Sequence, residues 1–178
     1  PSPTSRRGTG TTGSPPTTSP ARNLVADSGF DHDVAAWRPL PGAFLTRGSA
    51  AMPANHARVQ RDPSTPATTD PKTGRALYGM VLPVIRSAAV GMHVDATVQI
   101  RATRAQVPVL LRLSELAGGR TAARSEVRTV LTDTAWHLLE VDRKVGTAGA
   151  AIQVEVGALA LHPDEAVYVD NVRVSSRP

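Results

Sequence analysis

The feature that most constrains the fold of this chain is an alternation of apolar and polar residues with a period of two. Residues 91–102, GMHVDATVQIRA, carry it in its clearest form. Successive side chains of a β-strand point to opposite faces, so this stretch predicts a strand with one buried and one wet face. The same period recurs in VPVLLRLSE (107–115), AWHLLEVDRKV (135–145), AIQVEVGALAL (151–161) and AVYVDNVRV (166–174).

Clusters of turn-forming residues separate the alternating stretches. They are LPG (40–42), DPST (62–65), TDPKTG (69–74), AGG (117–119), GTAG (146–149) and HPDE (162–165). Gly, Pro, Asp and Ser favour turns because they adopt backbone angles or local hydrogen bonds that strands do not use. Helical periodicity with capping residues is missing. Many short strands with regular turn signals predict an all-β fold, an antiparallel β-sandwich.

The first 21 residues differ in composition from the rest of the 178-residue chain. Residues 1–21 are rich in Pro, Thr, Ser and Gly, which predicts an extended linker, or an arm that lies against a neighbouring subunit. Residues 22–178 are long enough for one sandwich domain with a substantial core. Only 3% of the residues are aromatic, so that core must be aliphatic.

The formal net charge of +5 raises the question of nucleic-acid binding. The arginines are scattered singly along the chain, lysine occurs only at Lys72 and Lys144, and no aromatic residues interleave with the basic ones. We therefore expect no nucleic-acid partner. No apolar run reaches the roughly 18 residues of a membrane span. The absence of cysteine excludes disulfides and thiolate chemistry.

Catalytic motifs are missing from the sequence. The five histidines are dispersed, and no nucleophile elbow, phosphate-binding loop or metalloprotease motif is present. Two acids meeting in a cleft would suit a glycosidase, but nothing nominates a pair. We predict that the chain is not an enzyme, and a small glycosidase is only a third hypothesis.

The acid that the pattern singles out is Asp170 in the closing stretch AVYVDNVRV. Strict alternation places Asp170 on the same side as Val172 and Val174, which suggests that it points inward. A buried carboxylate requires a partner, which can be a hard cation, backbone N–H groups or an arginine. Asp31 is a natural second oxygen donor if the first and last strands are neighbours, and two carboxylates with carbonyls and waters suit Ca²⁺. An Asp that caps a turn is the equally plain alternative.

Four stretches resemble the β-jelly-roll carbohydrate-binding modules of families four, nine and twenty-two. NLVADSGFDHDVAAW (23–37) is similar to their opening Asn-Leu, turn, Phe-Glu and Trp, and GMHVDATVQIRA to their strand ending in a basic residue and Ala. LTDTAWHLLEV resembles their Thr-x-x-Trp strand, and VYVDNVRV their closing Tyr-(Ile/Val)-Asp-Asp-Val strand. The four pieces span nearly the whole domain in the right order. The resemblance implies a jelly-roll sandwich.

The resemblance also implies a structural Ca²⁺ held by Asp31 and Asp170, the pair that the alternation suggested. Two positions depart from the family pattern. Asp31 is one methylene shorter than the usual Glu, and Asn171 replaces the second closing Asp.

Glycan recognition in such modules uses exposed aromatic rings and polar side chains. Phe30, Trp37, Trp136 and Tyr168 lie at signature positions, where we expect core packing. Tyr78 and Phe44 are then the candidate platforms, although each is equally suited to a core or rim position. The candidate ligand-binding residues are Tyr78, Phe44, His93, Gln99 and Arg112. Outward polar residues such as these either line a concave face, with Asp95, Gln153 and Glu155, or form an ordinary solvated surface.

The function predicted from the sequence is a non-catalytic carbohydrate-binding module tethered by its linker to a secreted or surface protein. Its partner would be a polysaccharide or a cell-surface glycan, and its location extracellular. The alternative is a structural or decoration domain of a larger assembly, such as a phage virion, that uses the same sandwich for protein contacts. The poor supply of stacking aromatics favours that alternative.

Overall fold

The structure is a computed structural model that describes residues 22–48 and 55–178. The predicted linker or arm, residues 1–21, lies outside the described residues. The described part contains strands and turns and no helix, so no membrane-spanning helix is found in it.

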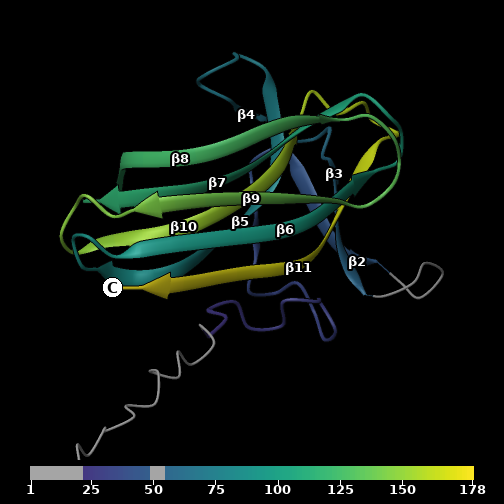
Figure 1. The fold of residues 1–178 in the computed structure, drawn as a ribbon. Helices are drawn as coiled ribbons and strands as arrows, with labels where there is room; N and C mark the ends of the chain where they lie inside the picture. The colour runs from purple at the N-terminus through teal and green to yellow at the C-terminus, as the bar shows by residue number, and fades with distance from the viewer. Residues whose placement is uncertain (1–21, 49–54) are drawn as a thin grey trace, which may run out of the picture.

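Eleven strands form two antiparallel sheets that pack face to face (Figure 1). Sheet A has the order β1-β5-β10-β7-β8, with β4 also paired to β5, and sheet B has the order β2-β3-β11-β6-β9. The strands of sheet A are β1 (Arg38–Pro39), β4 (Thr68–Thr69), β5 (Ala76–Ala88), β7 (Val107–Ala117), β8 (Arg120–Leu131) and β10 (Ala150–Leu159). Those of sheet B are β2 (Ala43–Gly48), β3 (His56–Arg61), β6 (His93–Ala102), β9 (His137–Lys144) and β11 (Ala166–Arg177). This arrangement confirms the predicted antiparallel sandwich.

The alternating stretches form strands as predicted, four of them central and one, β9, at an edge of sheet B. In β6 the buried residues alternate strictly with half-buried ones, and Val94, Val98 and Ile100 are buried completely. The facing sheet contributes Val109, Leu111 and their neighbours on β7 and β10 to the same core. Each of the six predicted turn clusters falls between two consecutive strands. The core is therefore an aliphatic layer between two pleated sheets.

Strand β8 could not be recognised from the alternation. Its sequence, RTAARSEVRTVL, is mostly exposed or half-buried because β8 is the edge strand of sheet A and pairs only with β7. An edge strand at the rim of a sandwich buries little of either face, so its apolar signal is weak. Figure 1 shows β8 along the upper side of the molecule.

The opening segment extends sheet B where β3 ends. The N–H of Leu24 donates to the carbonyl of Val174, and the N–H of Val172 donates to the carbonyl of Ser28. The side chain of Asn23 accepts from the N–H of Val174 (2.9 Å) and donates to the carbonyl of Val172 (3.2 Å). The first described residues therefore lie beside the last strand, as the resemblance implied.

A bulge in β11 overturns the strict alternation expected for the closing strand. The register of β11 against β6 shifts between Asp170 and Arg173, and Asn171 has a positive φ of 49°. Val167 and Val169 therefore face the core before the bulge, and Val172 and Val174 after it. Asp170 does not share a face with the two later valines, and the prediction that it points into the sandwich was wrong.

Two of the four signature aromatics are core residues, as expected. Phe30 is completely buried and Trp37 nearly so, and their rings meet at a centroid distance of 6.1 Å. Tyr168 alternates with the core residues Val167 and Val169, so it lies on the outer side of sheet B. Trp136 is only partly buried and precedes β9. Tyr168 is buried at 8% exposed but lies outside the core between the sheets, and Trp136 is only half-buried, so the expected packing in the sandwich core was wrong for these two residues.

Replacement of Phe30 by Ala is expected to lower the free energy of unfolding by about 3–5 kcal/mol, because it leaves a cavity beneath the opening segment. Phe44→Ala removes the same ring from an exposed position and should change that free energy by no more than about 0.5 kcal/mol. Urea unfolding followed by circular dichroism measures both. Equal losses would contradict the burial of Phe30.

Candidate functional site

The structure places the five predicted ligand-binding residues in three different environments. Phe44 on β2, together with His93 and Gln99 on β6, belongs to the outer face of sheet B. Arg112 on β7 belongs to the outer face of sheet A, and Tyr78 on β5 belongs to the core. The five side chains therefore do not form one site.

Tyr78 is not an exposed platform. It pairs with Ala158 of β10, another core residue, and only 5% of its surface is exposed. Its neighbours Leu77 and Gly79 take the outward positions, because successive side chains of β5 alternate between the two faces. Of the two candidate platforms, only Phe44 is exposed, at 56%.

Arg112 lies at the centre of a buried ion cluster on the outer face of sheet A. The Arg112 cluster consists of Arg112, Asp70, Glu126, Arg128 and Glu155. Arg112 donates through Nη1 to Glu155 (2.6 Å), through Nη2 to Asp70 (2.9 Å) and through Nε to Glu126 (3.0 Å). Arg128 donates to both Asp70 oxygens at 2.9 and 2.8 Å, and its Nε donates to Glu126 at 2.9 Å. Carboxylates of the protein thus occupy the guanidinium of Arg112, so it is not available to a ligand.

The predicted turn TDPKTG positions the key acid of this cluster. The carboxylate of Asp70 accepts from the N–H and the hydroxyl of Thr73 at 3.0 and 2.7 Å, and it is completely buried. Lys72 of the same turn lies 3.4 Å from Glu126. Beside the cluster, Leu77, Leu110 and Leu159 form a second small apolar core with Leu40. The turn is thereby tied across the outer face of sheet A.

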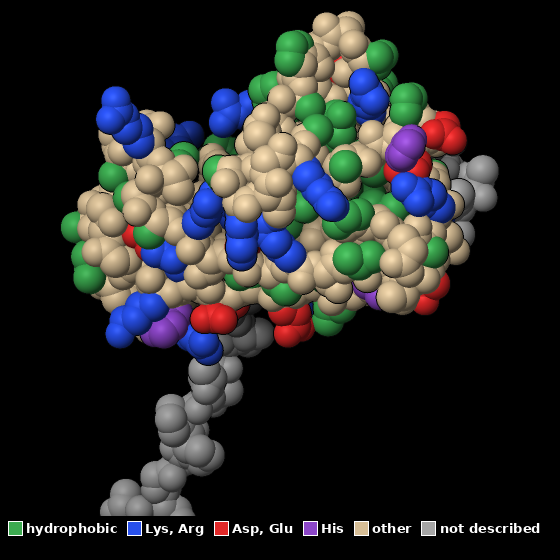
Figure 2. All heavy atoms as spheres, turned by 90° about the horizontal axis from the view of Figure 1, so that it is seen from above, with side chains coloured by type: hydrophobic (Ala, Val, Ile, Leu, Met, Phe, Trp, Pro, Cys, Tyr) green, Lys and Arg blue, Asp and Glu red, His purple; other side chains and the backbone are tan. Residues whose placement is uncertain are grey.

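Charge pairing and burial shift the pKa values within the cluster in opposite directions. The hydrogen bonds from Arg128, with those from Thr73 and Arg112, hold the pKa of Asp70 well below its usual range. Arg128 and Arg112 lower the pKa of Glu126 to about 2. Burial raises the pKa of Glu155, and the nearby charge of Arg112 opposes this. The arginines of the cluster thus largely cover its acids. Figure 2, seen from the β8 side, shows many Lys and Arg side chains and few acidic ones.

The outer face of sheet B carries a row in which aromatic and arginine side chains alternate. Tyr168 of β11 pairs with Arg58 of β3 on one side and with Arg101 of β6 on the other. The Cζ atom of Arg101 lies 4.9 Å from the ring centroid of Tyr168 and 5.3 Å from that of Trp136. We call Trp136, Arg101, Tyr168 and Arg58 the arginine–aromatic row. Phe44 lies on the neighbouring strand β2, paired with Gln60.

Sequence reasoning missed this row because its members come from four separate stretches. The available signal was the outward position of Arg58 between the core residues Ala57 and Val59, and of Arg101 between Ile100 and Ala102. Only the strand order 3-11-6-9 brings these positions together. The expectation that aromatic and basic residues do not interleave holds along the chain but fails across the sheet.

Farther along sheet B, two polar hollows share Asp95 and Thr97. One, of about 500 Å³, also includes Glu140, Asp142 and Arg177, and the other, of about 270 Å³, includes Asn23, Arg173 and Ser175. In the part of the chain that the structure describes, Glu140, Asp142 and Arg173 make no side-chain hydrogen bond or ion pair. These hollows therefore offer free acceptors and donors to a polar ligand.

The two acids predicted to hold a metal do come together. The carboxylates of Asp31 and Asp170 lie 3.5 and 3.8 Å from the point where a Cβ on Gly29 would stand. Asp170 is 6% exposed and accepts from the N–H of Asn171 at 2.6 Å. Burial raises its pKa, the hydrogen bond and His56 oppose this, and the charge of Asp31 raises it further. Two oxygen donors that repel each other fit a hard cation between them.

The surroundings of this pair contain one departure from a simple cation site. Arg47 donates to the carbonyl oxygens of Phe30 and Asp31, and Asn55 donates to the carboxylate of Asp31 at 3.0 Å. Arg47 thus occupies two carbonyls that a cation would otherwise use.

A second group of possible metal ligands consists of His162, Asp164 and Glu165. Protein groups already bind its buried acid, because the Glu165 carboxylate accepts from the His162 N–H and from Arg104.

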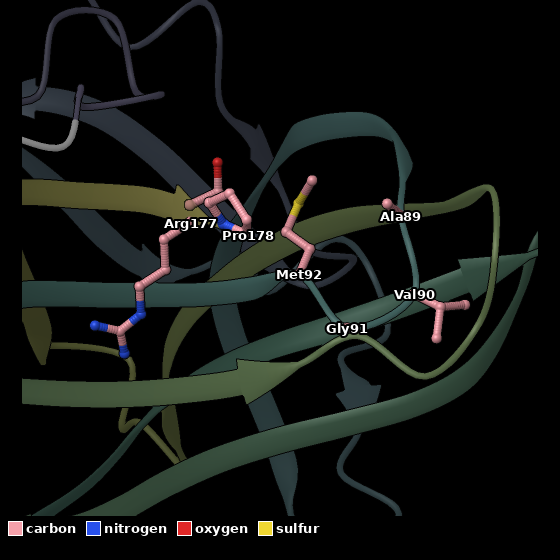
Figure 3. Close-up of a pocket in the computed structure, with 7 residues that line it drawn as sticks. Ala89, Val90, Gly91, Met92, Arg177 and Pro178 are labelled. Atoms are coloured by element: carbon pink, nitrogen blue, oxygen red, sulfur yellow. The ribbon is translucent and has the colours of Figure 1, made fainter.

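Two further hollows are mainly apolar. One, of about 470 Å³, lies at the end of the sandwich, where Figure 3 shows Met92 between Pro178 and the other residues of the β5–β6 turn. The other, of about 540 Å³, lies on sheet A and includes Arg75, Pro108, Arg128, Val130 and Leu159. Neither brings several unpaired polar groups to one point.

The Arg112 cluster generates a prediction about pH. The lowered pKa values of Asp70 and Glu126 mean that their stabilisation is present above the ordinary values of 3.8 and 4.5. It is lost as the pH falls, for Glu126 through about pH 2. Asp70→Asn should lower the unfolding free energy at neutral pH by about 3–5 kcal/mol, because it removes the buried charge that accepts hydrogen bonds from both Arg112 and Arg128. It should also flatten the acid dependence.

Urea titrations between about pH 2 and pH 7 measure both effects. Asp164→Asn, at an exposed acid outside the cluster, is the control and should behave as the parent protein. An Asp70→Asn variant with an unchanged acid dependence would show that the cluster does not set it.

Comparison with known proteins places the fold. No family model matches the sequence, and no curated protein matches it. Solved structures do match. The xylan-binding domain CBM22-1 of Paenibacillus barcinonensis Xyn10C has a TM-score of 0.63 at 12% identity, covering 90% of this chain and 97% of that one. TmCBM61, solved in complex with β-1,4-galactotriose, has a TM-score of 0.59 at 13% identity and covers 88% and 100%.

A third match belongs to a phage protein. The enzymatically active domain of tailspike protein 4 of bacteriophage CBA120 has a TM-score of 0.61 at 11% identity, covering 87% of this chain and 21% of that one. At such identities the likeness concerns the fold alone. The chain therefore has the jelly-roll β-sandwich fold of carbohydrate-binding modules, as its sequence predicted.

Proposed function

We propose that this domain is a non-catalytic glycan-binding module that contacts its ligand through the outer face of sheet B. The observation that carries the proposal is the contrast between the two outer faces. Sheet B presents the exposed ring of Phe44, the partly buried ring of Trp136 and polar groups without protein partners. Sheet A presents an ion cluster whose members are paired with one another.

The chemistry of sheet B suits a sugar chain. Aromatic rings pack against the apolar faces of pyranose rings, and carboxylates and guanidinium groups exchange hydrogen bonds with hydroxyls. The outward residues of β6 run from His93 through Asp95, Thr97 and Gln99 to Arg101. At about 3.3 Å per residue, these nine residues extend over nearly 30 Å, which is room for several sugar units. Phe44, His93 and Gln99, three of the predicted ligand residues, belong to this face.

The attachment of the module to a larger protein is also part of the proposal. A Pro/Thr-rich segment such as residues 1–21 would tether the module to a secreted or surface protein, so that a weak affinity acts at high effective concentration. The resemblance to modules named for xylan and galactotriose supports a polysaccharide ligand.

A structural or decoration role in a larger assembly is the second candidate. The covered face of sheet A and the single exposed aromatic side chain favour it, and the fold match to a phage tailspike domain is compatible with it. Such a domain would use its outer faces for protein contacts and would bind no glycan.

A glycan array separates the two candidates and tests the face. We expect binding to at least one polysaccharide, and we expect Phe44→Ala and Trp136→Ala each to weaken it roughly tenfold, since each removes a ring that packs on sugar. Val130→Ala, which removes an exposed side chain from sheet A, is the matched control and should bind as the parent does. Loss of binding in Val130→Ala alone would move the site to sheet A, and an array without any hit would favour the structural role.

We also propose that Asp31 and Asp170 hold a structural Ca²⁺. The raised pKa of Asp170 means that the metal-free domain loses stability as the pH rises through that pKa, since the charged form is the disfavoured one. Bound Ca²⁺ would favour that charged form, so the gain from Ca²⁺ should grow with pH. At 100 times its dissociation constant, Ca²⁺ should add about 2.7 kcal/mol of stability.

Thermal unfolding with Ca²⁺ and with EDTA measures this effect. The parent protein should melt at a higher temperature with Ca²⁺, whereas Asp170→Asn should melt at the same temperature in both. Asp142→Asn, at an exposed acid of sheet B, is the control and should keep the response. A parent protein whose melting curve does not change with EDTA would remove the metal from this site.

A further inference from the structure

The arginine–aromatic row carries an inference about the ligand that rests on the proposed function and goes beyond it. We infer that Arg58 binds a carboxylate, so that the glycan recognised carries uronic acid residues on an otherwise neutral chain. The sequence and the fold comparisons point only to a polysaccharide; the charge distribution of sheet B narrows its chemistry.

The row holds its two arginines in different ways. Arg101 is stacked between the rings of Trp136 and Tyr168, an arrangement that fixes a guanidinium plane. Arg58 lies on the other side of Tyr168, on β3. Within the described residues, Arg58 forms no ion pair with a carboxylate, and its Nε is buried without a hydrogen-bond partner.

The unpaired atom of Arg58 points to the kind of ligand. A buried N–H without a partner is rare in proteins and suggests a group that pairs with it from outside. Nε and a neighbouring Nη form the edge of a guanidinium that binds a planar carboxylate through two parallel hydrogen bonds. A carboxylate that docks on this edge would also lie beside Tyr168, in the same row. A neutral hydroxyl would satisfy Nε but would leave the charge of Arg58 unpaired.

The acids that flank the row along the chain already have partners. Glu165, three residues before Tyr168, is paired with Arg104, and Asp133, three residues before Trp136, is hydrogen-bonded to His137 at 2.8 Å. Asp170 faces Asp31 near Gly29. None of these acids is paired with Arg58 in the described residues, so its guanidinium is free to bind a carboxylate of the ligand.

The same face argues against a fully anionic ligand. A nucleic acid or a polyuronate would continue from the row along β6 and β9 into the hollow that contains Asp95, Glu140 and Asp142. There it would meet the carboxylates of Glu140 and Asp142, which are unpaired within the described residues and whose repulsion is unfavourable at close range, while Arg177 is already paired with Asp95. A chain with occasional carboxylates avoids this conflict: one acidic unit binds at Arg58, and neutral units exchange hydroxyl hydrogen bonds with the polar hollows.

Isothermal titration with glucuronoxylan and with the same polymer after chemical reduction of its carboxyl groups tests the inference on the unaltered protein. We expect roughly tenfold or more weaker binding to the reduced polymer, since a charge-assisted hydrogen-bond pair is lost. Methyl glucuronide and methyl glucoside, followed through tryptophan fluorescence, repeat the comparison on a single ring. The glucuronide should perturb the emission because Trp136 belongs to the row, whereas Trp37 is buried in the core.

Variants then assign the effect to Arg58. Arg58→Gln should bind both polymers equally, and Arg58→Lys, which keeps the charge but loses the two-pronged edge, should also lose most of the preference. Arg61→Gln is the matched control, because it removes one positive charge from the same strand at an exposed position outside the row. It should keep the preference, with a change of less than about twofold.

Five outcomes would overturn the inference. Equal binding of the two polymers by the unaltered protein is one, and equal effects of Arg58→Gln and Arg61→Gln, which indicate general electrostatics, are another. Single-stranded DNA or polygalacturonate binding as tightly as glucuronoxylan, with the same dependence on Arg58, would indicate a general polyanion site. No binding to glucuronoxylan, with array binding to a neutral glycan, removes the acidic specificity and leaves the proposed function intact. An array without any hit removes both.

Discussion

The packing of two aliphatic sheet faces against each other is the constraint on which the rest of this structure depends. With six aromatic residues in 178, the domain fills its core with Val, Leu, Ile and Ala, and the inward positions of both sheets together form a continuous layer. The alternation along the strands forces polar residues onto both outer faces. The outward charged residues of sheet A pair with one another, whereas several of those on sheet B have no side-chain partner within the described residues. This difference makes the outer face of sheet B the candidate binding surface.

On the outer face of sheet A, the charged side chains form ion pairs with one another. Asp70 reaches across from the β4–β5 turn and pairs with Arg112 and Arg128, so charges that began on separate strands neutralise one another. A paired and buried charge cluster offers little to a ligand, because any new partner has to displace an existing one. On sheet B the residues near Asp95 line two open hollows, and within the described residues Glu140, Asp142 and Arg173 stay without a side-chain partner.

The two ends of the described chain meet at the edge of sheet B. The side chain of Asn23 forms hydrogen bonds with the backbone of β11 that a neighbouring strand would otherwise form. The bulge at Asp170 turns that acid away from the core and towards Asp31. A plain strand would have placed Asp170 on the same side as Val172, where an unpaired carboxylate is costly. The bulge lets one strand carry core valines on both sides of an outward acid.

Much of the fold was predictable because its signal is local. The strands around Val98, Val109 and Val154 alternate over their whole length, and turn residues mark the connections between them. The edge strand β8 was not recognisable, since a strand that is half exposed on both faces has little apolar pattern. Motifs at the two ends of the chain predicted that Asp31 and Asp170 come together. They did not predict the bulge in β11 that directs Asp170 towards Asp31.

The sequence by itself determined the two-sheet sandwich and its aliphatic core, because these follow from period, turns and composition, and the signature at residues 23–37 indicated the buried positions of Phe30 and Trp37. Only the tertiary structure decided the environment of each candidate ligand residue. Tyr78 and Phe44 look alike in sequence, yet one packs in the core and the other is exposed. Arg58, Arg101 and Trp136 form one row for the same reason: strand order, which no local pattern encodes, decides which outward side chains become neighbours.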